Sequence, residues 1–554
     1  MDDYLQRKPI LDWWRKGYRS LRILAAIMAF LGLLTFANVS DAVTYYVDSQ
    51  SGDNSYAGTS ETEAWRTISR VNLQHYSPGD ELLFRRGGEW TDVNICINTA
   101  SLKIGAYSVG PAPRLLGSIP VAGWKKKTDG IFFKFFPRPA SHKDWAKWDV
   151  QLVMEEDHPY GFYKKVDSYQ ALGEPGSFYY NTQGQKLYVR PFDADAFPKK
   201  RIWVGRQDNI VELRSLQITD LTVRDLEISL SNRYGIGPWW QGDKQTQGTI
   251  IVENNNFIGN AFSAVCLSGG MSFERILIRN NRIRKNGAEG IYIGKHVGRK
   301  AVEITNNEVG DPVDKNFGWR GEGPQSAFNG DGIEVKTGNR GVLIGSNRIR
   351  NLTGYCGICT GSSDALVIDN EIADIRMPGS EWPAAAAGVY FDVDDSFGVI
   401  KVVENRMKLS EADGIHVRGK YDLHPGAVIE ANDIELTADN PNAQIEFTVM
   451  NSRNVQIISN RGSGGAYGLA FNAAPAYPPV GYVIVGNEFL NTTISPFFFS
   501  QNNGEDLNDL KLEANKVCTD SPVFIQWKSG EKVNSFSVAK KLLGEKSIVG
   551  QKCP

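Results

Sequence analysis

The segment NGDGIEVKTGNRGVLIGSNRI contains two acids and a lysine within six residues: Asp331, Glu334 and Lys336. Carboxyl groups serve as general acids, general bases or nucleophiles, and a lysine serves as a base or neutralises a negative charge. An apolar residue precedes both Glu334 and Lys336, and this alternation predicts a short strand whose apolar side chains point inward. We therefore expect Glu334 and Lys336 to face outward together.

The same strand pattern recurs along the chain, beginning at residues 263, 289, 331, 356, 387, 413, 443, 467 and 495. Its third and fifth letters are nearly always apolar, so its fourth and sixth letters are expected to face outward. The outward letters include Cys266, Tyr292, Glu334, Cys359, Tyr390, His416 and Glu446 at the fourth position, and Lys336, Asp392 and Arg418 at the sixth. Titratable and aromatic groups thus gather in the middle repeats, which favours a site over scattered surface charge.

A pair of these carboxyl groups is suited to glycoside hydrolysis, which requires one acid held protonated and another held ionised. Glu334 and Asp392 are the best-placed outward pair, two repeats apart, or roughly 9 to 10 Å at the strand spacing. That separation leaves room for a water molecule and favours an inverting reaction. Asp331, Asp394 and Asp395 are substitutes if a bend turns them into the same groove, and a glycine follows Asp331.

Two repeats are longer than the others, and their inserted loops contain Trp319 and Trp382. Loops that lengthen at nearby repeats can form the walls of a groove, and tryptophan faces are platforms for sugar rings. In the alternative interpretation both tryptophans only pin their loops to the surface. The expected substrate-binding residues are Tyr292, Trp319, Trp382, Tyr390, His416 and Arg418.

An asparagine that follows an apolar strand fixes the register of the repeat, with steps mostly of 23 to 28 residues. That period is typical of one coil of a right-handed parallel β-helix. Asparagines at the same bend of every coil can exchange side-chain hydrogen bonds, so we interpret them as structural. The fold is therefore predicted to be all-β, a right-handed parallel β-helix solenoid of about eleven coils. The aligned residues are Asn255, Asn281, Asn307, Asn347, Asn370, Asn405, Asn432, Asn460, Asn487 and Asn515.

The region before the repeat carries a pattern that includes Tyr46-Val47-Asp48, Trp65, Pro78-Gly79-Asp80 and Gly87-Gly88-x-Trp90. It resembles the N-terminal cap of exported right-handed β-helix proteins of carbohydrate metabolism. The resemblance implies that the amphipathic segment WRTISRVNL covers the open end of the stacked strands. It also implies action on a polysaccharide.

Residues 118–204 interrupt the repeat, and the segment GSFYYNTQGQKLYVRP predicts two alternating strands around a Gln-Gly turn. The region resembles the small β-sandwich inserted in several β-helix glycoside hydrolases, including the type with β-xylosidase activity. Such a module could overhang a groove, or it could serve stability or interaction.

A second resemblance favours a different reaction. Residues 331–349 resemble the lysine-bearing strand of β-helix lyases that cleave alginate and dermatan sulfate. In that alternative Lys336 abstracts a proton beside a uronate carboxylate, which Arg418 or a bound cation neutralises; the pKa of the lysine must then be depressed. Calcium would be the implied cofactor, whereas a hydrolase needs none. The sequence departs from these lyases on the next coil, where CGICTGS replaces their arginine.

A third alternative is a non-catalytic glycan-binding or exopolysaccharide-assembly protein, in which Lys336, Asp392 and Arg418 form only a solvated ion-pair ladder. A formal net charge of −2 gives no indication of a nucleic-acid partner. The favoured function is an exported polysaccharide-cleaving enzyme, with a glycoside hydrolase preferred to a lyase.

Basic residues before the apolar run ILAAIMAFLGLLTF, and small residues up to Ala42, predict a signal peptide or signal anchor over residues 1–42. The expected location is periplasmic or extracellular, with anchoring in a membrane by this segment as the alternative. The remaining predicted parts are a cap with the first coils (43–117), the inserted module (118–204), the β-helix (205–517) and a C-terminal cap (518–554).

The six cysteines predict one disulfide and no zinc site. Cys518 and Cys553 are expected to form a disulfide that staples the C-terminal tail in an oxidising compartment. Cys356 and Cys359 form a C-x-x-C without a second ligand pair at zinc spacing, so no zinc site is predicted. Cys266 and Cys359 are interpreted as packing residues.

Overall fold

The computed structural model describes residues 41–554 except for 99–100, 129, 140–147, 157, 159–160, 215–217, 239–247, 312–329, 363, 377–385, 394–397, 420–425, 449–454, 473–480, 500–509, 520, 528–531, 536, 539–540, 542–547 and 551–554. The segment Thr44–Pro554 forms one compact unit. The expected signal segment lies almost wholly outside the described residues. Among those described, no helix has the length and apolar character needed to span a bilayer.

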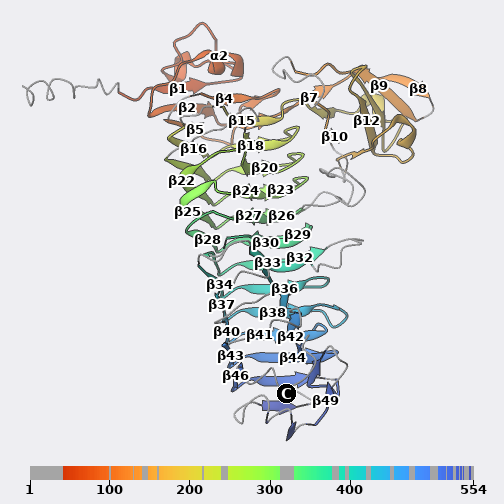
Figure 1. Ribbon diagram of the computed structural model, residues 1–554. Coiled ribbons are helices and arrows are strands. Elements are labelled where there is room, and N and C mark those ends of the chain that lie inside the picture. The colour runs from red at the N-terminus through yellow and green to blue at the C-terminus, as the bar shows by residue number, and fades with distance from the viewer. Residues whose placement is uncertain are drawn as a thin grey trace, which may run out of the picture. The chain divides into compact units, whose positions relative to one another are not determined.

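Three long sheets run along this unit, each of fourteen strands, and successive strands stack coil upon coil (Figure 1). The first sheet runs from β1 (Thr44–Val47) to β46 (Leu510–Glu513), and the third from β3 (Glu89–Trp90) to β50 (Ile548–Gly550). Each coil passes from the first sheet to the third and then to the second. This all-β parallel architecture confirms the predicted β-helix.

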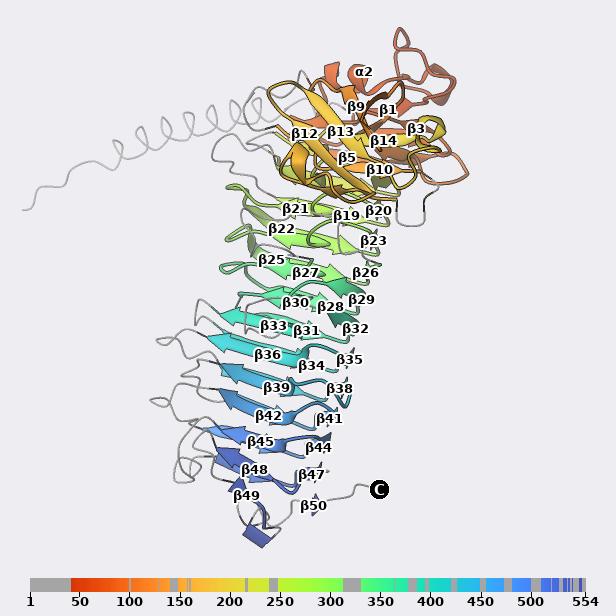
Figure 2. The ribbon, with the colours of Figure 1, turned by 90° about the vertical axis from the view of Figure 1, so that its right-hand side faces the viewer.

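The second sheet carries the strands singled out in the sequence, and Figure 2 shows it turned toward the viewer. Its neighbours pair in parallel except at the last pair, which is antiparallel. In order its strands are β4 (Ile95–Ile97), β15 (Asn209–Leu213), β18 (Tyr234–Pro238), β21 (Val265–Leu267), β24 (Ile291–Ile293), β27 (Ile333–Val335), β30 (Cys356–Thr360), β33 (Ala387–Val393), β36 (Asp413–Gly419), β39 (Ala443–Thr448), β42 (Tyr467–Asn472), β45 (Ser495–Phe499), β48 (Ile525–Trp527) and β49 (Lys532–Val533).

The apolar letters of the repeat form one continuous core inside the coils, from Val47 to Ile525. Ile333 and Val335 are fully buried in it, as the alternation predicts. Burial of such side chains contributes roughly 1.5 to 3 kcal/mol each, which makes it the main favourable contribution to stacking.

The asparagines form a continuous ladder at the bend between the first and third sheets. The side-chain oxygen of Asn370 accepts hydrogen bonds from the backbone N–H and the side-chain amide of Asn347, both at 3.0 Å. The amide of Asn370 in turn donates to the carbonyl of Ile344 at 2.9 Å. The residue before it, Asp369, has a left-handed φ of 54°. The ladder thus holds a sharp bend whose polar groups are buried, as predicted.

The sequence repeat predicts about eleven coils, fewer than the fourteen strands of each sheet. The reason is that the ladder begins only at Asn255. The earlier coils, which include β4 and β15, lack the marker asparagine at that bend and escape detection by the repeat.

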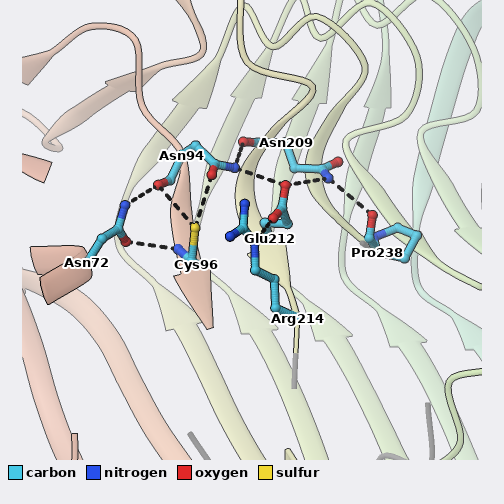
Figure 3. A network of polar contacts seen from close by, with 7 residues as sticks. All are labelled: Asn72, Asn94, Cys96, Asn209, Glu212, Arg214 and Pro238. Carbon is cyan, nitrogen blue, oxygen red and sulfur yellow. Dashed lines mark hydrogen bonds and ion pairs between the residues drawn. The ribbon is translucent and has the colours of Figure 1, made fainter. Parts of the chain in front are cut away.

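Helix α2 (Ile68–Leu73) lies beside the edge strand β4. The side chain of Asn72 donates to the carbonyl of Asn94 at 2.7 Å and accepts from the backbone N–H of Cys96 at 3.0 Å. Figure 3 shows this contact and its continuation through Asn94 to the carbonyl of Asn209. The helix therefore satisfies backbone groups that the edge of a parallel sheet would otherwise leave open.

Residues 118–205 form two smaller sheets outside the coils. One contains β7 (Ser118–Val121), β10 (Val153–Glu155) and β14 (Ile202–Gly205), and the other contains β8 (Lys125–Thr128), β9 (Ile131–Phe135), β11 (Lys164–Lys165), β12 (Ser177–Asn181) and β13 (Lys186–Arg190). Strands β12 and β13 pair antiparallel, as the hairpin pattern predicts. Both sheets contribute to one apolar core, which contains Val121, Val204, Phe178 and Val189. We call residues 118–205 the inserted module.

Candidate active site

The register of the second sheet aligns the outward letters as the repeat predicts. Glu334 pairs with Tyr292 on one side and with Cys359 on the other. The same row continues through Tyr390, His416 and Glu446. Asp392 pairs with Arg418 in the neighbouring row, and Lys336 lies in that row because it follows Val335, which pairs with Thr360. The predicted residues from several coils therefore lie on one face.

A bend at the start of the strand brings a further side chain to this face in the coils of Asp331 and Asp413. At equivalent positions, Asp413 and His416 are hydrogen-bonded, although they are three positions apart in the sequence. In the coil of Asp331 the bend passes through Gly332, where an added Cβ would lie 2.5 Å from the carbonyl oxygen of Gly357. No larger residue fits without a shift of the backbone. The bend brings Asp331 to the same side as Glu334, as the substitute interpretation requires.

Three carboxyl groups and one ammonium group form the centre of this face. Lys336 makes an ion pair with Glu334. Asp331 is buried and accepts hydrogen bonds from the backbone N–H groups of Tyr355 and Cys356, both at 3.0 Å. Glu289, one coil earlier, accepts a hydrogen bond from the hydroxyl of Ser263 at 2.7 Å.

Burial and mutual repulsion favour protonation of two of these acids. Burial, and then the charge of Glu334, raises the pKa of Glu289 to about 7. Burial and the charges of Glu334 and Glu289 raise the pKa of Asp331 well above its usual range. The cluster therefore combines a carboxylate paired with a lysine and an acid that keeps its proton near neutral pH.

Burial alone would lower the pKa of Lys336, but the charge of Glu334 and the hydrogen bond to it raise that pKa above its usual value. Lys336 is therefore held as an ammonium ion. A base for β-elimination must instead be deprotonated, so this arrangement disfavours the lyase alternative.

Two pockets adjoin at Glu334 and Lys336. Pocket I has a volume of ≈ 380 Å³, and its lining includes Asp331, Tyr355, Tyr390, Asp392 and Arg418. Pocket II has a volume of ≈ 500 Å³, and its lining includes Arg233, Tyr234, Phe262, Glu289 and Tyr292. Glu334 and Lys336 line both pockets. A ligand that fills both would therefore pass directly over the ion pair.

The structure separates the other predicted residues into two groups. Asp392, Tyr390 and Arg418 line pocket I, and Tyr292 lines pocket II. Asp392 is exposed and lies on β33, two strands from the strand of Glu334.

His416, by contrast, is buried and outside both pocket linings, with Nδ1 2.9 Å from Asp413 and Nε2 2.6 Å from Thr448. His416 is thus not part of either lining, and its expected contact with substrate remains a prediction. Its ring centroid lies 5.0 Å from that of Tyr390, with which it pairs on the next coil, so it packs beside this residue of the pocket I lining.

Trp319, Trp382, Asp394 and Asp395 lie outside the described residues. The predictions that depend on them therefore remain predictions.

Sequence reasoning missed Glu289, Tyr355 and Lys295, all of which line one of the pockets. A signal for Glu289 was present, because the segments EGIYIG, DGIEVK and DGIHVR share an acid before the glycine of the bend. This acid precedes the alternating part of the strand, so the alternation does not predict whether its side chain faces inward or outward.

The cysteines correct one interpretation. Cys356 and Cys359 form a disulfide across the bend, with their Cα atoms 5.8 Å apart, so Cys359 is not simply a packing residue. Alternation of the strand would direct these two side chains to opposite faces, and the bend overrides it. Cys266 is free and buried, as expected. Cys518 is disulfide-bonded, and Cys553 lies outside the described residues.

Two groups in the described part of the chain bring three potential metal ligands within 4.8 Å of one another. The first is Asp331 with the two sulfurs of the Cys356–Cys359 disulfide, which are not thiolates. The second is Asp413, His416 and Glu446, in which both ring nitrogens of the histidine already have hydrogen-bond partners. Neither group is a ready-made ligand set.

Residues 239–420 match a family model described as "Right handed beta helix region". Together with the three stacked sheets, this match defines the chain as a right-handed parallel β-helix protein. Lacto-N-biosidase of Bifidobacterium longum subsp. longum is 22% identical over 391 residues, which are 65% of this chain and 22% of the relative. The chain thus spans about a fifth of the length of this curated relative.

Among solved structures, the complex of XylC with xylose has a TM-score of 0.55 at 13% identity, covering 92% of this chain and 86% of the other. That likeness shows the fold. The GH136 lacto-N-biosidase from Eubacterium ramulus has a TM-score of 0.35 at 13% identity, covering 88% of this chain and 67% of the other.

Proposed function

We propose that this chain is a glycoside hydrolase that cleaves a glycan bound across pockets I and II. The observation that carries the proposal is the position of Glu334, which lines both pockets and lies beside acids whose pKa values are raised. A curated relative is named lacto-N-biosidase, and XylC, whose fold is similar, was solved in complex with xylose. Both findings support a glycan as the substrate.

In the proposed reaction Glu334 is the ionised carboxylate that acts on the anomeric carbon or on a water molecule. Glu289 is the general acid that protonates the leaving oxygen, because a pKa of about 7 keeps its proton available near neutrality. Asp392, the partner expected from the sequence, is the alternative second carboxyl in pocket I. The aromatic rings of Tyr390 and Tyr292 offer one sugar platform in each pocket.

The test is incubation of the purified chain with neutral and uronic-acid glycans while reducing ends and unsaturated uronates are measured. We expect new reducing ends without unsaturation, and a loss of roughly 10²- to 10⁴-fold in Glu334→Gln and in Glu289→Gln. Glu435→Gln, an exposed carboxylate on the third sheet, is the matched control and should retain full activity.

Full activity of Glu334→Gln would exclude the proposed centre, and unsaturated products would establish elimination. If Asp392→Asn is inactive while Glu289→Gln is active, the acid is Asp392. Retention of a glycan without any cleavage would instead support the binding protein.

A further inference from the structure

The inserted module is attached to the coils at the residues that form one wall of pocket II. Asn232 is fully buried there. Its side-chain amide donates to the carbonyl of Asp149 in the module at 2.9 Å, and its side-chain oxygen accepts from the backbone N–H of Gln151 at 2.8 Å. The next two residues, Arg233 and Tyr234, line pocket II. This polar attachment therefore lies directly behind the pocket.

An apolar seam joins the module to the same wall. Leu152, Phe162 and Trp203 of the module form one buried cluster with coil residues that include Phe262 and Ala288. Phe262 and Ala288 also line pocket II. The module approaches closely here, since a Cβ added at Gly259, whose φ is 65°, would lie 2.6 Å from the ring of Phe162. A side chain at Gly259 would therefore meet the ring of Phe162 rather than empty space.

The wall itself is a packed set of side chains. The rings of Tyr234 and Phe262 meet edge to face, with centroids 5.7 Å apart. The guanidinium of Arg233 lies 5.6 Å from the centroid of Phe262 and is paired with Asp208 at 3.5 Å. A shift of Phe262 would thus move its two neighbours in the wall. An aromatic wall with one cation fits a sugar ring with its hydroxyl groups.

We propose that the inserted module determines specificity at pocket II. Phe162 and Trp203 are positioning residues that never touch the sugar but fix Phe262 and Ala288 from behind. The module thereby sets the shape of the subsite and selects the sugar residue on that side of the cleaved bond. This inference rests on the proposed function, which makes pocket II a sugar subsite.

The test compares Phe162→Leu with Phe178→Leu. Both residues are buried phenylalanines of the module, but Phe178 belongs to its internal core and not to the seam. Oligosaccharides that differ by one sugar on either side of the cleaved bond serve as substrates. We expect Phe162→Leu to change the ratio of kcat/KM between two such substrates by roughly tenfold, mainly through KM. Phe178→Leu should lower the melting temperature comparably but change that ratio less than about twofold.

The same variants are then made in the Glu334→Gln chain, and their affinity for the oligosaccharides is measured by calorimetry. This measurement reports on pocket II even if hydrolysis is absent, so it separates the two proposals. An altered order of affinities in Phe162→Leu alone supports the inference. The inference would be overturned if Phe162→Leu left both selectivity and affinities unchanged, or if both variants had equal effects. It would also be overturned if the chain bound none of the oligosaccharides.

Discussion

Glu334 of strand β27 forms an ion pair with Lys336, the residue that follows the strand, at the boundary between two pockets. The pair thus places a negative and a positive charge where the linings of the two pockets meet. The lysine lies 6.0 Å from the ring centroid of Tyr292, which further fixes its position. Substitution of Lys336 tests whether its charge keeps a neighbouring carboxyl group ionised.

Lys336→Met should reduce activity at neutral pH by roughly 10- to 100-fold and move the acidic limb of the pH profile to higher pH. The reason is that a carboxylate among other acids becomes harder to ionise without its cation. Lys336→Arg keeps the charge and should retain most activity. Arginine cannot act as a base at these pH values. Elimination would therefore be favoured if Lys336→Arg were inactive and Lys336→Met left the acidic limb of the pH profile at its original pH.

The pH profile of kcat/KM should fall on its basic side with an apparent pKa of about 7, the value to which burial raises the pKa of Glu289. The sign follows from the role of a general acid, which is active only while protonated. Glu446 is a useful control, since burial and the charge of Asp413 also raise its pKa to about 7. Glu446→Gln should retain the basic limb of the pH profile. Loss of this limb in Glu446→Gln would show that it reports on Glu446 and not on Glu289.

The free energy of unfolding should decrease between about pH 4.5 and pH 7 because of the carboxyl group of Glu289. The pKa of Glu289 is raised in the folded state, so the fold binds a proton that the unfolded chain releases in this range. The stabilisation is complete below the unfolded pKa and is lost as the pH rises through about 7. Its upper bound is about 3 kcal/mol. Thermal unfolding at constant ionic strength should show a flatter pH dependence for Glu289→Gln, and an unchanged slope would contradict the shift.

Asn370→Ala should lower the free energy of unfolding by about 2 to 5 kcal/mol, because it removes the acceptor of two hydrogen bonds from Asn347 and the donor to the carbonyl of Ile344. Gln456→Ala on the exposed side of β40 (Val455–Ile458) removes an amide without such a role and should change stability by less than about 0.5 kcal/mol. Urea titration followed by circular dichroism measures both. Equal midpoints would show that the ladder is not stabilising.

Gly332→Ala should impair both stability and activity, since the new methyl group would lie 2.5 Å from the carbonyl oxygen of Gly357 and 2.8 Å from Ile349. The backbone must shift at the bend that brings Asp331 beside Glu334. We expect a loss of about 1 to 3 kcal/mol, as for other overpacked positions. Gly105→Ala is the control, because its nearest atom lies at 3.4 Å. Normal melting of Gly332→Ala would show that the bend tolerates a side chain.

The sequence by itself determined the coil and the direction of most side chains. Both depend on local rules that repeat in every coil: inward Ile333 and Val335 alternate with outward Glu334 and Lys336, and each bend has its asparagine. Stacking of the coils then follows, because backbone groups at an open strand edge and a buried asparagine side chain both cost free energy when they lack hydrogen-bond partners. The row from Tyr292 to Glu446 was therefore predictable.

Only the tertiary structure decided which acids meet. The bend at Gly332 turns Asp331 against the alternation of its strand, and burial against neighbouring coils raises the pKa of Glu289. The Cys356–Cys359 disulfide depends on the local bend, and the apolar cluster that Phe162 shares with Phe262 of pocket II depends on close packing between distant segments. Periodicity fixes which way a side chain points within a strand, whereas proximity, and with it the pKa, depends on how separate coils and the module pack.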